Sequence, residues 1–132
     1  MADNRLKKIL YVEDEPDIQA VAQIALETLG GFELKMCSSG QEALAQAQAY
    51  DPDLLLLDVM MPDLDGPATL QALRQLPSLG ATPAMFMTAK VAPDEVAQLK
   101  SMGAIAVIPK PFDAMTLAQC IQDGWNEHHG VS

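Results

Sequence analysis

Acidic side chains follow two of the apolar runs in this sequence. Glu13, Asp14 and Glu15 come directly after one run, and Asp58 comes directly after another. If the runs are neighbouring strands, these carboxylates converge, and two of them about 4 Å apart repel by up to about 4 kcal/mol at an effective dielectric constant of about 20. Protons or a divalent cation must offset this repulsion, and Mg²⁺ prefers such oxygen ligands. Glu15 and Asp17 are better explained as solvated charges at a helix N-terminus, so Asp14 and Asp58 are the stronger candidates.

A hydroxyl and an ammonium group follow two further apolar runs. Thr88 comes directly after the run 84–87, and Lys110 follows the run 105–108 after one proline. Alone, Thr88 fits an ordinary strand end and Lys110 a surface charge. Together with the carboxylates, they supply a nucleophile, a metal site, a hydroxyl donor and a cation. This combination predicts a phosphoryl-transfer site, in which the protein contributes positioning and charge neutralisation.

The apolar runs that position these residues are predicted to be strands. Four of them are nearly continuous in apolar residues, which is typical of strands buried on both faces, and one alternates like a half-exposed edge strand. In chain order the five predicted strands are 9–12, 33–36, 54–57, 84–87 and 105–108, the second being the alternating one.

Segments with helical periodicity separate the strands. The first carries Ile18, Val21, Ala22, Ala25 and Leu29 before two glycines, and the second follows Ser39. The third is ended by Pro77, and the fourth runs from Pro93 to Gly103. The fifth is capped by Asp113 and carries Leu117, Cys120, Ile121 and Trp125. Repeated strand–helix alternation requires right-handed crossovers and a parallel sheet. The predicted fold class is therefore α/β, a doubly wound five-stranded parallel sheet with five helices and its chemistry beyond the carboxyl ends of the strands.

Length and composition exclude several other classes of protein. A chain of 132 residues with 49% hydrophobic and 20% charged residues fits one globular domain. The formal net charge of −10 repels nucleic acid and anionic lipid, and no run approaches the roughly 18 apolar residues of a membrane span. We therefore expect no direct nucleic-acid binding and no membrane insertion. Cys37 and Cys120 form no CxxC motif and are expected to be small core residues of a reduced compartment, which favours a cytoplasmic protein.

Four motifs in order along the chain resemble those of the receiver domains of two-component response regulators. They are the run YVEDEP ending at Pro16, the run LDVMMPDLDG over residues 57–66, the run MTA around Thr88, and the run KPF that begins at Lys110. The resemblance implies a flavodoxin-like, CheY-like receiver fold. It extends from about Lys8 to about Glu127, so we expect a single, stand-alone receiver domain over residues 1–132 with a core of about 8–127 and no output domain.

The resemblance also implies a role for each candidate residue. Asp58 would accept a phosphoryl group, Asp14 would bind Mg²⁺ directly, Glu13 would bind it through water, Met60 would give its backbone carbonyl to the metal, Thr88 would hydrogen-bond a phosphoryl oxygen, and Lys110 would neutralise charge. The donor would be a sensor histidine kinase or a histidine phosphotransfer protein, and the output would be altered contacts with a downstream protein. No enzymatic activity is expected beyond this self-directed phosphotransfer and autodephosphorylation.

Several positions depart from the family pattern. Glu13 stands where Asp is more frequent, and Val107 stands where the family often has Tyr or Phe, so the usual conformational switch is not expected. Met60 and Lys90 flank the place where water would attack, which leaves the phosphoryl lifetime open.

Two structural features are also expected near the site. Gly66 is expected where a side chain would crowd the loop that carries Asp58. The resemblance further implies a cis peptide bond between Lys110 and Pro111, a geometry found in only about 5 to 6% of X–Pro bonds.

Three other functions fit parts of the pattern. An aspartate-nucleophile phosphatase shares the covalent chemistry, but usually has a second Asp two residues after the nucleophile, where this chain has Met60. A flavodoxin-like cofactor binder needs a phosphate-binding loop after the first strand, where Glu13, Asp14 and Glu15 would repel phosphate. A phosphorylation-independent interaction module would keep only the fold, and the complete set of acceptor residues argues against it.

Overall fold

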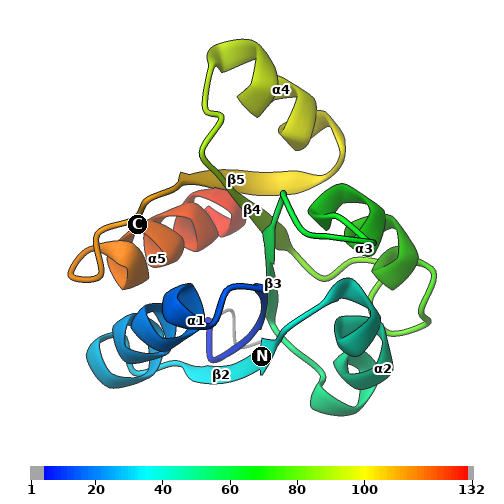
Figure 1. Cartoon of the computed structure of the whole chain (residues 1–132), viewed down its shortest axis with the longest axis horizontal. Helices are drawn as coiled ribbons and strands as arrows, with labels where there is room; N and C mark the ends of the chain where they lie inside the picture. Colours follow the sequence, from blue (N-terminus) through cyan, green and yellow to red (C-terminus); the bar gives the residue numbers. More distant parts are fainter. Residues whose placement is uncertain (1–4, 131–132) are drawn as a thin grey trace.

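The predicted strands form one parallel five-stranded sheet (Figure 1). The computed structural model describes residues 5–130. The strands lie in the order β2-β1-β3-β4-β5, so β2 lies beyond β1 on one side and β4 and β5 lie beyond β3 on the other. Their bounds are β1 (Lys8–Val12), β2 (Glu33–Cys37), β3 (Leu54–Asp58), β4 (Ala84–Thr88) and β5 (Ala104–Pro109).

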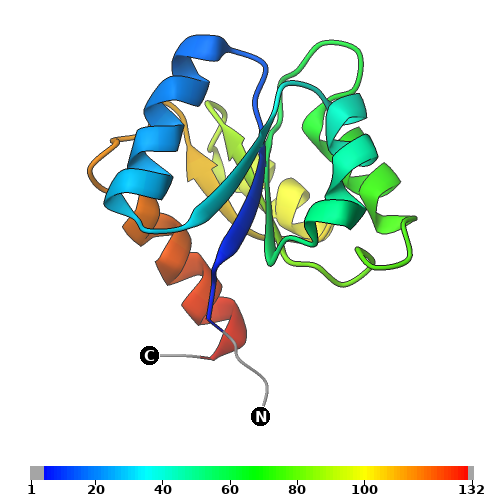
Figure 2. The ribbon, with the colours of Figure 1, turned by 90° about the horizontal axis from the view of Figure 1, so that it is seen from below.

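Helices cover both faces of the sheet, as predicted for a doubly wound fold (Figures 1 and 2). In chain order they are α1 (Pro16–Gln23), the π-helical segment η1 (Ile24–Leu29), α2 (Gly40–Tyr50), α3 (Gly66–Arg74), α4 (Pro93–Ser101) and α5 (Leu117–His129). α1, η1 and α5 pack on one face, and α2, α3 and α4 pack on the other. The predicted α/β fold class is confirmed.

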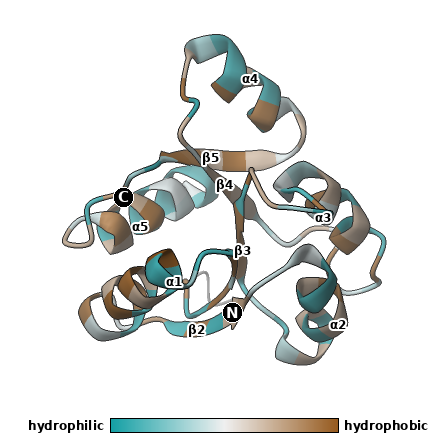
Figure 3. Ribbon diagram, viewed as in Figure 1, coloured by the Kyte–Doolittle hydropathy of each residue, from teal (hydrophilic) through white to brown (hydrophobic). Residues whose placement is uncertain are grey.

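Two apolar clusters make up the core, one on each face of the sheet. Successive residues of β3 point to opposite faces, so Leu55 and Leu57 join the cluster under α2, α3 and α4, while Leu54 and Leu56 join the cluster under α1, η1 and α5. In Figure 3 the inner strand β3 is mainly brown, whereas β2 is largely teal and the helices carry both teal and brown residues. Burial on both faces explains why these strands are nearly continuous in apolar residues.

The first helical segment differs from the prediction in the side chains that it buries. Ala22, Ala25 and Leu26 are fully buried, but Val21 and Leu29, which were expected in the core, are 44% and 52% exposed. For Leu29 the reason is that the expected pattern assumed 3.6 residues per turn throughout, whereas the last six residues of the segment form a π-helix, which is wound more widely. Val21 lies before the π-helix, in α1, on the exposed side of that helix. The segment still ends at the predicted glycines.

The ends of α3 and α5 also differ from the prediction. α3 ends at Arg74, before the predicted terminator Pro77, and Leu76 lies outside the helix, where the following proline disfavours helical conformation. Asp113 caps a separate turn, in which its Oδ1 accepts a hydrogen bond from the Met115 amide at 2.8 Å, and α5 begins only at Leu117.

The two cysteines have different environments. Cys37 is buried, as expected, and burial raises the pKa of its thiol to about 11. Cys120 is exposed, so the expectation of a core residue was wrong there. The core face of α5 follows Leu117, Ile121 and Trp125 at four-residue spacing, and Cys120 lies beside that line. Within residues 5–130, none of the helices combines the length and the apolar character needed to cross a membrane.

Candidate functional site

The register of the sheet brings the predicted site residues to one edge. β1 pairs with β3 through Val12 and Leu57, so the next residue of each chain segment, Glu13 after β1 and Asp58 at the end of β3, lies at the same level. Asp58 in turn pairs with Met87, which is followed by Thr88. Because all strands run parallel, their carboxyl ends meet at this edge, which is where the chemistry of such folds is expected.

Three carboxylates gather at this edge. Glu13, Asp14 and Asp58 each offer an oxygen atom, and these atoms lie within 4.8 Å of one another. Glu13 is fully buried, Asp58 is 4% exposed, and Asp14 is half-buried. Of the acidic residues that follow β1, Glu15 and Asp17 are exposed and lie outside the cluster, although the Glu15 amide donates a hydrogen bond to Glu13 Oε2 at 3.2 Å. The structure therefore separates the candidate metal ligands from the solvated helix-end charges.

Lys110 reaches this cluster from the end of β5. Its Nζ lies 3.0 Å from Glu13 Oε1 and 3.2 Å from Asp58 Oδ2. Burial alone lowers the pKa of Lys110, but the hydrogen bond to Glu13 and the negative charges of Asp58 and Glu13 raise it above its ordinary value, so the amine is held as an ammonium. The predicted cis peptide bond between Lys110 and Pro111 is confirmed.

Burial dominates the electrostatics of the carboxylates. Burial raises the pKa of Glu13 above its ordinary value, and the charge of Asp58 raises it further against the hydrogen bond from Lys110. Burial likewise raises the pKa of Asp58, while the Lys110 charge and hydrogen bonds from Lys110 and the Met60 amide oppose the rise. One ammonium thus faces three close carboxylates, which leaves negative charge uncompensated. A hard divalent cation with oxygen ligands fits this donor set.

Thr88 ends β4 next to the acidic cluster. It is 3% exposed, and its Oγ1 accepts a hydrogen bond from the Lys90 amide at 3.0 Å. A hydroxyl that accepts a hydrogen bond keeps its own proton to donate. Thr88 can therefore offer a donor to an anionic group bound at Asp58.

Two residues near Asp58 show how the surrounding loop is built. Gly66 opens α3, and a Cβ at this position would lie 2.9 Å from Val59 Cα and closer still to the Asp58 carbonyl oxygen, so the expected crowding is confirmed. Met60 is 68% exposed, which leaves its side chain outside the cluster. Val107 pairs with Phe86 and packs, partly buried, against the core under α2, α3 and α4.

The sequence analysis missed two side chains that contact Glu13. The Tyr11 hydroxyl lies 3.4 Å from Glu13 Oε1, and Gln19 Nε2 donates a hydrogen bond to the Glu13 carbonyl oxygen at 2.5 Å. Tyr11 was counted as one more apolar strand residue. Its spacing of two residues from Glu13 could have revealed it, because residues i and i+2 of a strand share one face.

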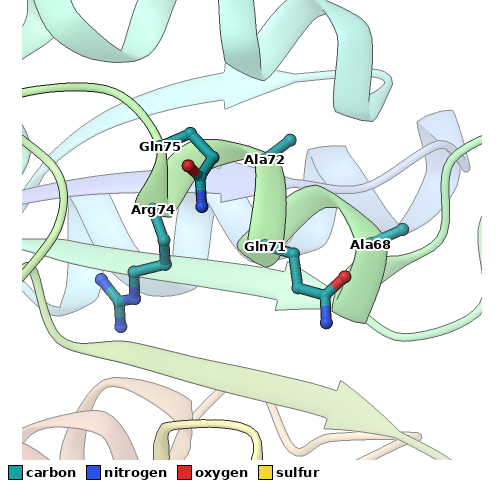
Figure 4. A pocket seen from close by; sticks show the side chains of 5 residues that line it. All are labelled: Ala68, Gln71, Ala72, Arg74 and Gln75. Atoms are coloured by element: carbon teal, nitrogen blue, oxygen red, sulfur yellow. The ribbon is translucent and has the colours of Figure 1, made fainter.

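A surface hollow on α3 is not part of this site. It lies along α3 and encloses about 550 Å³, and Figure 4 shows the side chains that line it, Ala68, Gln71, Ala72, Arg74 and Gln75. Arg74 is occupied there, since its guanidinium donates hydrogen bonds to the carbonyl oxygens of Leu79 and Thr82. The hollow contains no carboxylate, thiol or hydroxyl and offers no chemistry comparable to that at the strand ends.

The family model and the similar proteins of known name point to the same family. A sequence model described as the response regulator receiver domain matches residues 9–122. The response regulator Rre1 of Synechocystis is 32% identical over 115 residues, which is 87% of this chain and 50% of that protein. The alkaline phosphatase synthesis transcriptional regulatory protein PhoP of Bacillus subtilis is 41% identical over 107 residues, which is 80% of this chain and 43% of that protein. The chain thus spans about half the length of these curated relatives.

Solved structures give the same result. The chemotaxis response regulator CheY4 of Vibrio cholerae superimposes with a TM-score of 0.82 at 30% identity, covering 91% of this chain and 99% of that one. A CheY-like receiver domain protein from Methanospirillum hungatei superimposes with a TM-score of 0.79 at 25% identity, covering 96% and 98% of the two chains. The similarity extends over almost the whole chain, including the strand ends that carry the acidic cluster.

Proposed function

Because this chain belongs to the response regulator receiver domain family, we propose that its acidic cluster accepts a phosphoryl group on Asp58 from a sensor histidine kinase or a histidine phosphotransfer protein. The observation that carries this proposal is the placement of Lys110, whose ammonium lies between the carboxylates of Glu13 and Asp58. A cation held there can neutralise charge on a phosphorylated aspartate.

The reaction is a transfer between two covalent carriers. A carboxylate oxygen of Asp58 forms a new bond to phosphorus while the phosphorus–nitrogen bond of the phosphohistidine breaks, and the departing imidazole nitrogen keeps the electron pair of that bond. The Asp58 carboxylate must be ionised to act as the nucleophile. Lys110 favours that ionised form, since its charge and hydrogen bond oppose the rise in the pKa of Asp58 that burial causes.

Mg²⁺ is the cofactor that fits this donor set, and when bound it would neutralise charge on the phosphoryl oxygens. Asp14 and Asp58 would hold it directly, Glu13 would hold it through water, and Met60 would contribute its backbone carbonyl. Two groups of the chain itself then act on the product: the Thr88 hydroxyl donates to a phosphoryl oxygen, and Lys110 stays paired with the modified aspartate.

The output proposed for this domain is a change in protein–protein contacts. We propose that phosphorylation alters the surface seen by a downstream protein, in the cytoplasm, and that the domain itself does not contact nucleic acid, because its net charge of −10 would repel it. Activity toward other molecules is not part of the proposal, which is limited to self-directed phosphotransfer and the loss of the phosphoryl group by hydrolysis.

Labelling with a small acyl phosphate tests this proposal. Wild-type protein is incubated with radiolabelled acetyl phosphate and Mg²⁺, alongside Asp58→Asn and Asp63→Asn. Asp63 is a matched control, because it lies exposed in the following loop with a positive φ of 67° that Asn tolerates. We expect labelling of wild type and Asp63→Asn, none of Asp58→Asn, and none in excess chelator. Equal labelling of Asp58→Asn, or full labelling in chelator, would refute the proposal.

A further inference from the structure

Tyr11 is a fully buried residue with a polar group next to the site. It is the fourth of the five residues of β1, where it pairs with Met36 on one side and Leu56 on the other. Its ring belongs to the apolar cluster under α1, η1 and α5. Its hydroxyl lies 3.4 Å from Glu13 Oε1, which is a long hydrogen bond. The two groups meet because residues two apart along an extended segment point to the same face. A buried tyrosine hydroxyl needs such a partner.

The carboxylate of Glu13 is held by protein groups on both of its oxygens. Oε1 accepts from Lys110 Nζ at 3.0 Å and from the Tyr11 hydroxyl, and Oε2 accepts from the Glu15 amide at 3.2 Å. Glu13 itself is fully buried, so bulk water does not replace a lost donor. Since a buried carboxylate without donors is unstable, these three groups determine where the carboxylate lies.

The Lys110 ammonium cannot pair equally well with Glu13 and with a phosphorylated Asp58. Its single ammonium already contacts both carboxylates, at 3.0 Å and 3.2 Å. A phosphoryl group on Asp58 adds anionic oxygens that compete for the same ammonium. When Lys110 moves toward them, the Tyr11 hydroxyl becomes the remaining side-chain donor to Glu13 Oε1.

We propose that Tyr11 is a positioning residue, which holds the Glu13 carboxylate in place for Mg²⁺ when Lys110 is engaged by Asp58 or its phosphoryl group. This inference rests on the proposed function. Outer partners that orient a metal ligand typically contribute a factor of about 10 to 100 in metal affinity. Because Glu13 is expected to act through water and the hydrogen bond is long, we expect the lower end of that range.

The test compares Tyr11→Phe with wild type and with Tyr50→Phe. Tyr11→Phe removes one oxygen atom and keeps the ring. Tyr50→Phe is the matched control, since Tyr50 ends α2 and its ring lies under Lys8, at the opposite end of β1 from Glu13. Mg²⁺ is titrated by calorimetry, and the rate of labelling by acetyl phosphate is measured as a function of Mg²⁺ concentration.

We expect Tyr11→Phe to raise the Kd for Mg²⁺ about tenfold and to raise the half-saturating Mg²⁺ concentration by the same factor. The labelling rate at saturating Mg²⁺ and the Tm in chelator should stay close to wild type, and Tyr50→Phe should change none of these quantities. An unchanged Kd for Tyr11→Phe, or a lower maximal rate with an unchanged Kd, overturns the inference. If Tyr11→Phe does not fold, Tyr11→Met, which fills the space with a flexible apolar chain, is measured in the same way.

A double-mutant cycle with Glu13→Asp shows whether the effect passes through Glu13. The shorter side chain withdraws the carboxylate from the Tyr11 hydroxyl, so Tyr11→Phe should change the Kd by less than about twofold in that background. An equal penalty in both backgrounds contradicts the inference. Failure of the proposed function would look different, because wild-type protein would then show no Mg²⁺-dependent labelling of Asp58 at all.

Discussion

Replacing Gly66 by alanine should change the geometry of the site without changing its charged residues. Every charged residue is retained, but the added Cβ would lie 2.9 Å from Val59 Cα and closer to the Asp58 carbonyl oxygen. Since carbon atoms in contact are normally about 3.5 to 4.0 Å apart, the backbone at residues 58–59 must shift by about 1 Å. We expect a loss of about 1 to 3 kcal/mol in the free energy of unfolding, as for other overpacked positions.

The same shift should slow phosphorylation much more than it lowers stability. A misplacement of about 1 Å at a reacting group can reduce a rate about 100-fold. Labelling by acetyl phosphate is measured at saturating Mg²⁺, under conditions in which urea titration shows both proteins to be folded. Gly80→Ala is the control, because a Cβ there meets nothing closer than the Arg74 carbonyl oxygen at 3.8 Å. Wild-type labelling rates and stability for Gly66→Ala would refute the reasoning.

Two further predictions concern pH and the conformational switch. Because burial raises the pKa values of Glu13 and Asp58 above their ordinary 4.5 and 3.8, the folded protein binds more protons than the unfolded chain. In chelator, the free energy of unfolding should therefore rise as the pH is lowered below neutral, and saturating Mg²⁺ should remove this dependence. Urea unfolding at several pH values would contradict this if the free energy of unfolding in chelator fell as the pH was lowered. Because valine has no ring to rotate, a beryllium fluoride phosphoryl mimic should shift amide resonances mainly in residues 88–91 and little at Val107. The coupling free energy between phosphorylation and target binding should be about 1 kcal/mol. Large shifts along β5 with unchanged resonances in residues 88–91 would contradict this prediction.

The fold could be predicted from the sequence because its strands are buried on both faces. Continuous apolar runs such as 54–57 leave little doubt about the strand, and helical segments between them leave few possible topologies. The site followed from the same argument, since Asp58 ends a strand and Glu13 and Lys110 come directly after strands.

The features that could not be predicted depend on tertiary packing. The π-helical winding of η1 changes which of its side chains are buried, so periodicity at 3.6 residues per turn misplaced Leu29. Cys120 is exposed because the core face of α5 passes beside it. Tyr11 was missed because a hydrophobic count treats tyrosine as apolar, although its hydroxyl reaches the most buried carboxylate of the site.

The most direct test of the central claim is to locate the phosphoryl group on the chain. Wild-type protein is treated with acetyl phosphate and Mg²⁺ and then reduced with borohydride, which converts an aspartyl phosphate to homoserine that mass spectrometry can place in the sequence. We predict homoserine at position 58 and at no other aspartate, and none when the reaction is run in chelator. Homoserine at position 14 instead, or protein that remains unmodified in the presence of Mg²⁺, would contradict the account.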